Sequence, residues 1–339
     1  MSLGLRISLG LAAVLAVGLA STFEHPPAQT VQRGYRGTGM VEVFNPALLD
    51  AKIAANAIPA AFAPASAEGP KAGKIYKNVK VLGDLSVGQF TRLMAGMTTW
   101  VAPQQGCGYC HSADNFAADD KYTKVVARRM LQMVAHINAD WQPHVGATGV
   151  TCYTCHRGQP VPAQLWFTSP GGPHPEGMLE SDVGKNLPAP AAGLAALPYD
   201  PYTPFLSGAA PIRVAATQAL PGTDRSSIKQ TEWTYALMVH FSEALGVNCT
   251  YCHNSRSFGD WSQSTPQRAT AWYGIRMVRD LNGVYLGSLA GVFPQQRLGP
   301  TGDVAKVNCA TCHQGAYKPL FGVSMLKDWP ELAGPVAAK

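Results

Sequence analysis

The sequence has no cysteine outside four short stretches, few charged residues, and no basic patch in which aromatic residues alternate with lysine and arginine. The missing basic patch argues against a nucleic-acid-binding protein, although the formal charge is +6. Charged residues make up only 14% of the 339 positions, whereas the chain holds 26 Pro and 34 Gly. This composition indicates much irregular backbone, packed against something rigid.

All eight cysteines lie in four stretches of the form Cys-x-x-Cys-His. This is the attachment pattern of c-type haem, in which two thiols add across the porphyrin vinyl groups and the adjacent histidine becomes the proximal iron ligand. Two intervening residues place the sulfurs far enough apart to reach both vinyl groups. The pattern predicts four covalently bound haem c groups, with thioether bonds to Cys107, Cys110, Cys152, Cys155, Cys249, Cys252, Cys309 and Cys312 and with His111, His156, His253 and His313 as proximal ligands.

Two other kinds of site could use the same cysteines. Four disulfides would explain an even number of cysteines in an exported protein, but a Cys-x-x-Cys pair is too close in sequence to staple a fold of 339 residues. Two structural zinc sites with four cysteines each would also match the count. Neither alternative requires a histidine after each pair, whereas haem attachment does.

Residues 1–21 are either a secretory signal or a membrane anchor. Arg6 is followed by an apolar run of 14 residues that ends at Ala20. The small residues from Gly18 to Ala20 resemble a cleavage site, which favours a signal peptide. Counted from the first residue, about 20 residues could instead span a bilayer with Arg6 on the cytoplasmic side. Both interpretations export the rest of the chain, and bacteria attach haem c outside the cytoplasmic membrane.

The remaining chain divides by composition and by repetition. Residues 22–80 are rich in Pro, Ala and Gly and predict either an extended arm with one short helix at about 46–57 or a disordered linker. Two motifs fall in a first dihaem half at 81–165 and two in a second dihaem half at 226–339, and a Pro- and Ala-rich segment at 166–225 connects them. The predicted fold is mainly α with much irregular structure, a multihaem cytochrome c.

An internal duplication relates the two halves. Leu93-Met94 precedes the first motif as Leu237-Met238 precedes the third, and both of these motifs read Cys-x-Tyr-Cys-His. The second and fourth motifs are each followed two residues later by a glycine, and the segment 133–138 before the second resembles the segment 277–282 before the fourth. The order predicts two haem pairs related by a pseudo-twofold axis.

Apolar residues at helical spacing predict helices at 84–94, 122–138, 233–245 and 269–281, the first with Ser86 as N-cap. A haem iron that only transfers electrons needs a sixth ligand, usually Met or His. Met94 and Met238 occupy the same place in the repeated unit and are the best candidates. Met130 and Met133 share the apolar side of the second helix, symmetry nominates Met277 for the fourth haem, and His136 and His144 stay open.

Several stretches resemble the tetrahaem cytochrome c subunit of purple bacterial photosynthetic reaction centres, from about Phe23 to the C-terminus. These stretches are Ile75 to Gly83, Val125 to Met130, Gly149 to His156, Thr265 to Arg268, Gly274 to Met277 and Cys309 to Gly315. The resemblance implies that Met94 ligates the first haem, Met130 the second and Met238 the third. It implies that His144, from the first half, ligates the fourth haem.

The resemblance also implies a haem order and a mode of attachment. In the family the third haem lies nearest the bacteriochlorophyll special pair, followed outward by the fourth, the second and the first. Arg268 resembles a family arginine beside the third haem, where a cation would raise the reduction potential. Thr22 stands where some members have a lipidated cysteine. Attachment of this chain then relies either on the N-terminal helix as an anchor, which we favour, or on protein contacts alone.

The function implied by the resemblance is electron transfer, without a bond-making residue. A soluble cytochrome c or a high-potential iron-sulfur protein would reduce the outermost haem, and the third haem would re-reduce the special pair. The implied partners are the reaction centre L and M subunits, with H and the light-harvesting 1 antenna, at the periplasmic face of the photosynthetic membrane. The alternatives are a multihaem oxidoreductase, which needs an open iron position, and a quinol-oxidising cytochrome, which needs more membrane contact.

Overall fold

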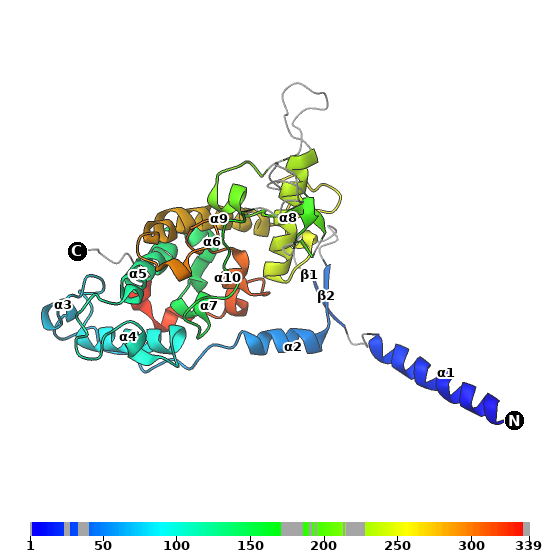
Figure 1. Cartoon of the computed structure of the whole chain (residues 1–339), viewed down its shortest axis with the longest axis horizontal. Helices are drawn as coiled ribbons and strands as arrows, with labels where there is room; N and C mark the ends of the chain where they lie inside the picture. Colours follow the sequence, from blue (N-terminus) through cyan, green and yellow to red (C-terminus); the bar gives the residue numbers. More distant parts are fainter. Residues whose placement is uncertain are drawn as a thin grey trace, which may run out of the picture.

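The computed structural model describes residues 2–23, 28–32, 41–170, 186–189, 192–193, 195–212, 214 and 228–334. Within them the chain is mainly helical, with irregular segments between the helices and two short antiparallel ribbons (Figure 1). This is the fold class that the sequence predicts. Half of the connecting segment at 166–225 lies outside the described residues.

Helix α1, Leu3–Thr22, projects away from the rest of the chain (Figure 1). A window of 18 residues within this 20-residue helix has a mean hydropathy of 2.0, and none of the helix residues is buried. Ser2 caps the helix, because its Oγ accepts a hydrogen bond of 3.4 Å from the Leu5 amide. The length and apolar composition are sufficient for α1 to cross a membrane, so α1 fits a membrane anchor.

The arm contains a small hairpin that the sequence analysis did not predict. Strands β1, Gln29–Gln32, and β2, Val41–Phe44, pair antiparallel. Helix α2, Pro46–Ala55, follows at the predicted place, capped by Asn45.

Beyond α2 the chain lies against the body as an irregular segment. The Ala57 carbonyl accepts from Tyr153 Oη at 3.0 Å, and the Phe62 carbonyl accepts from Arg92 Nη2 at 3.0 Å. The Ser66 carbonyl accepts from Ser86 Oγ at 2.5 Å. Side chains of the body therefore hold this part of the arm by hydrogen bonds to its backbone carbonyls. These bonds do not depend on which side chains the arm carries.

The four predicted long helices are confirmed, with ends displaced by a few residues. They are α4 (Val87–Val101), α5 (Tyr122–Asp140), α8 (Ile228–Leu245) and α9 (Pro266–Asp280). Ser86 and Gln89 form a capping box at the start of α4. Apolar residues of α4, α5, α8 and α9, such as Leu93 and Leu237, pack in one core cluster with Trp329.

The four motifs form single helical turns. The first and third motifs begin in 3-10 turns, η1 (Gly106–Tyr109) and η5 (Cys249–Tyr251), and the second and fourth form α7 (Cys152–His156) and α10 (Cys309–His313). The other elements are α3 (Ala72–Ile75), α6 (Gln142–Val145), η2 (Gly146–Thr148), β3 (Asn186–Pro188), β4 (Ala196–Pro198), η4 (Thr203–Ser207), η6 (Leu281–Leu286), η7 (Gly287–Leu289), η8 (Gln295–Arg297), η9 (Pro319–Gly322), η10 (Leu326–Asp328) and η11 (Pro330–Leu332).

Matching hydrogen bonds accompany the sequence repeat. Asn138 donates to the Val150 carbonyl at 2.9 Å and accepts from the Val150 amide at 2.8 Å. Asn282 donates to the Val307 carbonyl at 3.0 Å and accepts from the Val307 amide at 2.9 Å. Each buried asparagine thus holds the residue two positions before α7 or α10, so the second and fourth motifs are positioned in the same way.

The second and fourth motifs also contact each other reciprocally. Arg157, which follows α7, donates to the Cys312 carbonyl at 3.3 Å, and Gln314, which follows α10, donates to the Cys155 carbonyl at 3.4 Å. Both residues adopt the left-handed conformation, with φ of 50° and 49°. This exchange of equivalent contacts is what a twofold relation between α7 and α10 produces.

Candidate functional site

One cavity of about 2330 Å³ runs through the body of the chain. All eight cysteines and all four motif histidines line it, together with Met94, Met130, Met238 and His144. A pocket for one drug-sized molecule has roughly 300–1,000 Å³, so this cavity has room for several large groups. The structure therefore brings the predicted attachment cysteines, the motif histidines and the four sixth ligands implied by the resemblance to one continuous space.

The four motif histidines share one hydrogen-bonding arrangement. Each Nδ1 contacts a backbone carbonyl three or five residues further on: Phe116 for His111 (2.9 Å), Gln159 for His156 (2.8 Å), Phe258 for His253 (3.0 Å) and Ala316 for His313 (2.9 Å). Because Nδ1 donates its proton to the carbonyl, Nε2 carries the lone pair. The arrangement fixes the tautomer and the ring orientation that a metal ligand needs.

Burial favours the neutral form of three of these imidazoles, those of His156, His253 and His313, and the neutral form is the one that binds iron. Burial lowers the pKa of His313 to about 4, and His144 and Arg157 lower it further. Burial also lowers the pKa values of His156 and His253.

His144 lies opposite the fourth motif. Its ring centroid is 6.2 Å from that of His313, and its Nδ1 donates to the Thr270 carbonyl at 2.9 Å, as the motif histidines do to their carbonyls. Metal–nitrogen bonds of ~2 Å, with each nitrogen ~1 Å from its ring centre, give about 6 Å between two rings on one metal ion. The two rings are thus spaced as a shared iron requires.

Gly274, on α9, leaves room for the side chain of His144. A Cβ at Gly274 would lie 2.5 Å from His144 Cε1 and 2.8 Å from Nδ1. No residue larger than glycine fits there unless the His144 ring moves. The sequence analysis missed this role, and the only available signal was a glycine within a predicted helix.

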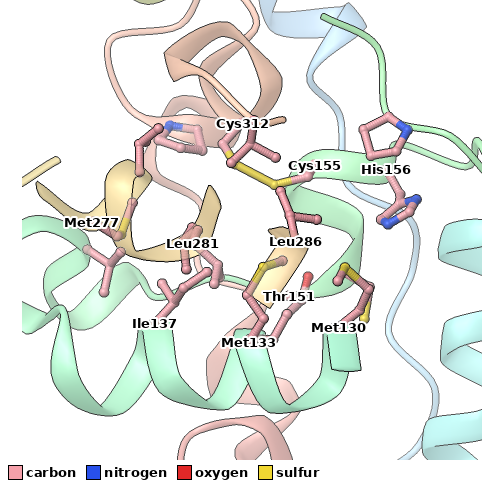
Figure 2. A pocket seen from close by; sticks show the side chains of 18 of the residues that line it. Met130, Met133, Ile137, Thr151, Cys155, His156, Met277, Leu281, Leu286 and Cys312 are labelled. Atoms are coloured by element: carbon pink, nitrogen blue, oxygen red, sulfur yellow. A yellow bond between two sulfur atoms is a disulfide. The ribbon is translucent and has the colours of Figure 1, made fainter. Parts of the chain in front are cut away.

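The methionines divide into two groups by burial. Met94 on α4, Met130 on α5 and Met238 on α8 are half-buried and line the cavity, and so does Met97 on α4, which the sequence analysis did not predict as a ligand. Met133 and Met277 also reach the cavity wall, but they are only 9% and 7% exposed and belong to the core cluster. Figure 2 shows Met130 on the same side of the cavity as His156.

Two other sequence-predicted residues are placed by contacts of their own. His136 bonds to Asp140 at 2.6 Å and to Asp280 at 2.5 Å, and it is not among the described residues that line the cavity. Arg268 lines the cavity, lies 4.2 Å from the Trp261 ring and donates to the Asp260 carbonyl at 3.0 Å. His136 is therefore a bridge between α5 and α9, whereas Arg268 faces the site.

The cysteines occupy two kinds of surroundings. Burial raises the pKa values of Cys152 and Cys309 to about 12, so both stay protonated. Cys155 and Cys312 form a disulfide between α7 and α10, with Cα atoms 4.5 Å apart (Figure 2), a pairing that the sequence analysis did not predict. A sulfur in a disulfide cannot form a thioether, so haem attachment at these motifs requires both thiols to be reduced.

The cavity wall is strongly cationic. Among the described residues that line it, Asp114 is the one acidic residue, and nine are cationic: Lys77, Lys80, Lys124, Arg128, Arg268, Arg276, Arg279, Arg297 and Lys318. Each haem carries two propionate groups, and buried carboxylates need cations or hydrogen-bond donors. The charge, the apolar side chains and the Cys and His pattern therefore fit haem in this cavity.

Comparisons with known proteins agree with this chemistry. The family model for the photosynthetic reaction centre cytochrome c subunit matches residues 24–333. The chain is similar to photosynthetic reaction centre cytochrome c subunits from three bacteria. It is 55% identical to that of Rubrivivax gelatinosus, covering 100% of this chain and 92% of the relative. It is 49% identical to the subunit of Thermochromatium tepidum, covering 98% of this chain and 82% of the relative. It is 42% identical to the subunit of Roseobacter denitrificans, covering 96% of this chain and 89% of the relative.

Proposed function

Because this chain belongs to the family of photosynthetic reaction centre cytochrome c subunits, we propose that it carries four haem c groups and re-reduces the photo-oxidised bacteriochlorophyll special pair. Membership of the family makes it an electron carrier subunit rather than an enzyme, with covalently bound c-type haem and an association with the reaction centre at the photosynthetic membrane. The observation that supports the count of four is the single cavity lined by all eight cysteines and all four motif histidines.

In this proposal each motif holds one haem through its two cysteines, and its histidine and a sixth ligand close the iron to other molecules. The sixth ligands are Met94, Met130 and Met238 for the first three haems and His144 for the fourth. The bound haem supplies one-electron exchange between ferrous and ferric iron. The chain orients the ligands, surrounds the haems with apolar side chains and offsets the propionates with the cationic wall.

The proposed order of the haems is third, fourth, second and first, counted from the special pair. Contact between α7 and α10 supports the middle of this order, since the second and fourth motifs exchange hydrogen bonds. A soluble cytochrome c or a high-potential iron-sulfur protein would reduce the first haem. The third haem would face the L and M subunits, in a complex with H and the light-harvesting 1 antenna.

The proposed organisation follows the repeat. Residues 81–165 and 226–339 form two dihaem halves, and the matched bonds of Asn138 and Asn282 support their equivalence. Residues 1–21 anchor the chain through α1, residues 22–80 form the arm, and residues 166–225 connect the halves. The body lies on the periplasmic side of the membrane, where haem attachment takes place.

The haem count is tested by the mass of the denatured chain after acid and organic solvent have removed any haem that is not covalently bound. The expected mass exceeds that of the polypeptide by four haems. A Cys107→Ala/Cys110→Ala double variant should lose one haem and keep three. A wild-type chain with fewer than four covalent haems would contradict the proposal.

A further inference from the structure

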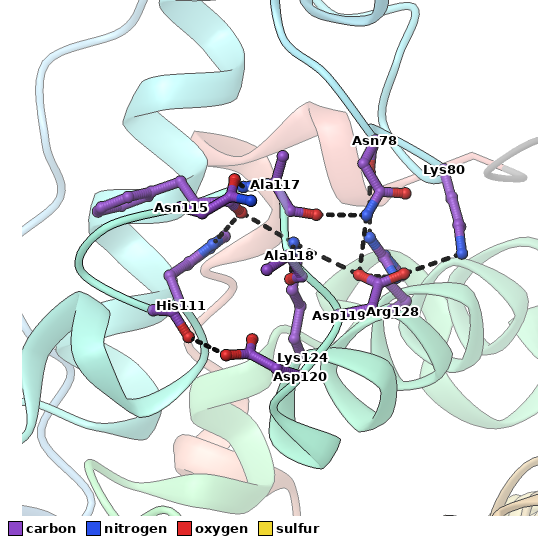
Figure 3. Close-up of polar contacts among 12 residues, drawn as sticks. Asn78, Lys80, His111, Asn115, Ala117, Ala118, Asp119, Asp120, Lys124 and Arg128 are labelled. Carbon is purple, nitrogen blue, oxygen red and sulfur yellow. Dashed lines mark hydrogen bonds and ion pairs between the residues drawn. The ribbon is translucent and has the colours of Figure 1, made fainter.

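Lys124 is a buried lysine at the start of α5, beside the loop that follows the first motif (Figure 3). It is only 6% exposed. Its Nζ donates to the carbonyls of Phe116 at 2.8 Å and Ala118 at 2.7 Å. An ammonium group removed from water needs such acceptors, so the lysine and the loop hold each other in place.

The Phe116 carbonyl has a second donor, which is the proximal histidine of the first motif. His111 Nδ1 donates to the same oxygen at 2.9 Å. A cation on that oxygen draws electron density away from the bond with His111. The His111 imidazole then keeps more of its proton and donates less electron density through Nε2.

The charge of Lys124 is not cancelled by the one carboxylate that it contacts. Asp119 Oδ1 is 3.4 Å from Lys124 Nζ, but Asp119 also pairs with Arg128 at 2.9 Å and with Lys80 at 3.0 Å. A hydrogen bond from Arg128 holds the pKa of Asp119 well below its ordinary value, helped by bonds from Lys80 and Asn78. Three cations thus share Asp119, and the cluster in Figure 3 keeps a positive balance next to His111 even when the second carboxylate, Asp120, which bonds to Ser112, is included.

We propose that Lys124 is a positioning residue for His111 that raises the reduction potential of the first haem. This inference rests on the proposed function, in which His111 ligates that haem. Two effects act in the same direction. The cation opposes the additional positive charge of ferric iron, and its bond to the Phe116 carbonyl limits the electron density that His111 gives to the metal.

The sequence repeat places a second cation in the same way. Lys124 stands nine residues before Met133, and Arg268 stands nine residues before Met277. Lys124 donates to the Ala118 carbonyl and Arg268 to the Asp260 carbonyl, and each of these lies seven residues after its motif histidine. A cation against this loop is therefore a feature of both halves. In the first half, Lys124 and the proximal histidine also share one acceptor, the Phe116 carbonyl.

The test is a redox titration of the haem α-band in the whole chain within its membrane complex. The first haem is assigned as the component that is missing from the Cys107→Ala/Cys110→Ala variant. In Lys124→Met we expect its potential to fall, so that the ratio of oxidised to reduced first haem at the wild-type midpoint rises roughly tenfold. Lys124→Arg keeps a charged donor and should stay near the wild-type potential.

Lys121→Met is the matched control. It removes the same charge from the N-cap of α5, where Lys121 Nζ donates to the Gly108 carbonyl. Lys121 is not among the described residues that line the cavity, and it does not share the Phe116 carbonyl with His111, so a much smaller shift is expected. An equal shift in Lys121→Met, or an unchanged potential in Lys124→Met with the first haem bound, would overturn the inference.

A second variant separates this inference from assembly of the haem. Should Lys124→Met fail to incorporate the first haem, Lys124→Gln keeps a neutral donor for the loop carbonyls and should still show the lower potential. An unchanged potential in that variant overturns the role of the charge. A Cys107→Ala/Cys110→Ala chain that loses no redox component would instead contradict the proposed function.

Discussion

A His144→Ala variant is expected to open the sixth position of the fourth haem, while the other three haems keep both of their ligands. Carbon monoxide binds ferrous haem only where a position is open, so the variant should bind it at one haem in four. On the proposed ligand set, in which a Met or His closes every iron, the wild-type chain should bind almost none. Difference spectra of the reduced chain with and without carbon monoxide measure this directly.

Met277→Leu is the matched control, because the repeat alone nominates Met277 as the ligand of the fourth haem. The 6.2 Å between the rings of His144 and His313 supports His144 instead. Met277→Leu should therefore bind no more carbon monoxide than the wild-type chain does. The assignment is wrong if Met277→Leu opens a haem and His144→Ala does not.

Gly274→Ala tests the same assignment without removing the ligand. The new Cβ would overlap the His144 ring, with a separation of 2.5 Å from Cε1. The ring must leave its present place opposite His313, so partial opening of the fourth haem is expected. Gly283→Ala serves as its comparison, because nothing lies within 4 Å of a Cβ at Gly283.

Arg92→Met is expected to lower the free energy of unfolding by about 3–5 kcal/mol, because it leaves a buried carboxylate without its cation. Arg92 Nη1 lies 3.7 Å from Glu331 Oε2, and the two side chains are only 6% and 4% exposed. The guanidinium also donates to three backbone carbonyls, those of Phe62, Ala63 and Asp328, and lies 3.6 Å from the centre of the Trp329 ring. One side chain thus joins the arm, α4 and the C-terminal segment.

The measurement is the urea denaturation of the solubilised chain followed by circular dichroism. Arg256→Met, at an exposed arginine, is the control and should change the free energy of unfolding by less than about 0.5 kcal/mol. An Arg92→Met/Glu331→Gln double variant should be more stable than Arg92→Met alone, because the buried charge is gone. Equal stability of the two would show that the Glu331 charge does not cause the loss.

Local patterns in the sequence were sufficient to predict the long helices, and a local pattern also nominates the haem attachment residues. The helix at 122–138 follows from the 3.6-residue spacing of its apolar residues, and the structure extends it only to Asp140. The attachment pattern fits within five consecutive residues, so no tertiary information is needed to find it. The hairpin of β1 and β2 gave no comparable signal, since each strand has only four residues.

Residues that act across the fold could not be derived from local patterns. His144 faces His313 from 169 positions away in the sequence, and the repeat pointed to Met277. Lys124 looked like an ordinary helical lysine, because the carbonyl that it shares with His111 becomes visible only when the loop is folded. Arg92 likewise reads as one polar position on α4, although it holds the arm through the arm's backbone.

The most direct test of the central claim is flash-induced absorbance of isolated photosynthetic membranes, recorded at the haem α-band and at the special pair after one saturating flash. The account predicts that a haem of this chain is oxidised in step with re-reduction of the special pair, and that a soluble donor later re-reduces the haem. Re-reduction of the special pair while the haems of this chain stay reduced would contradict it.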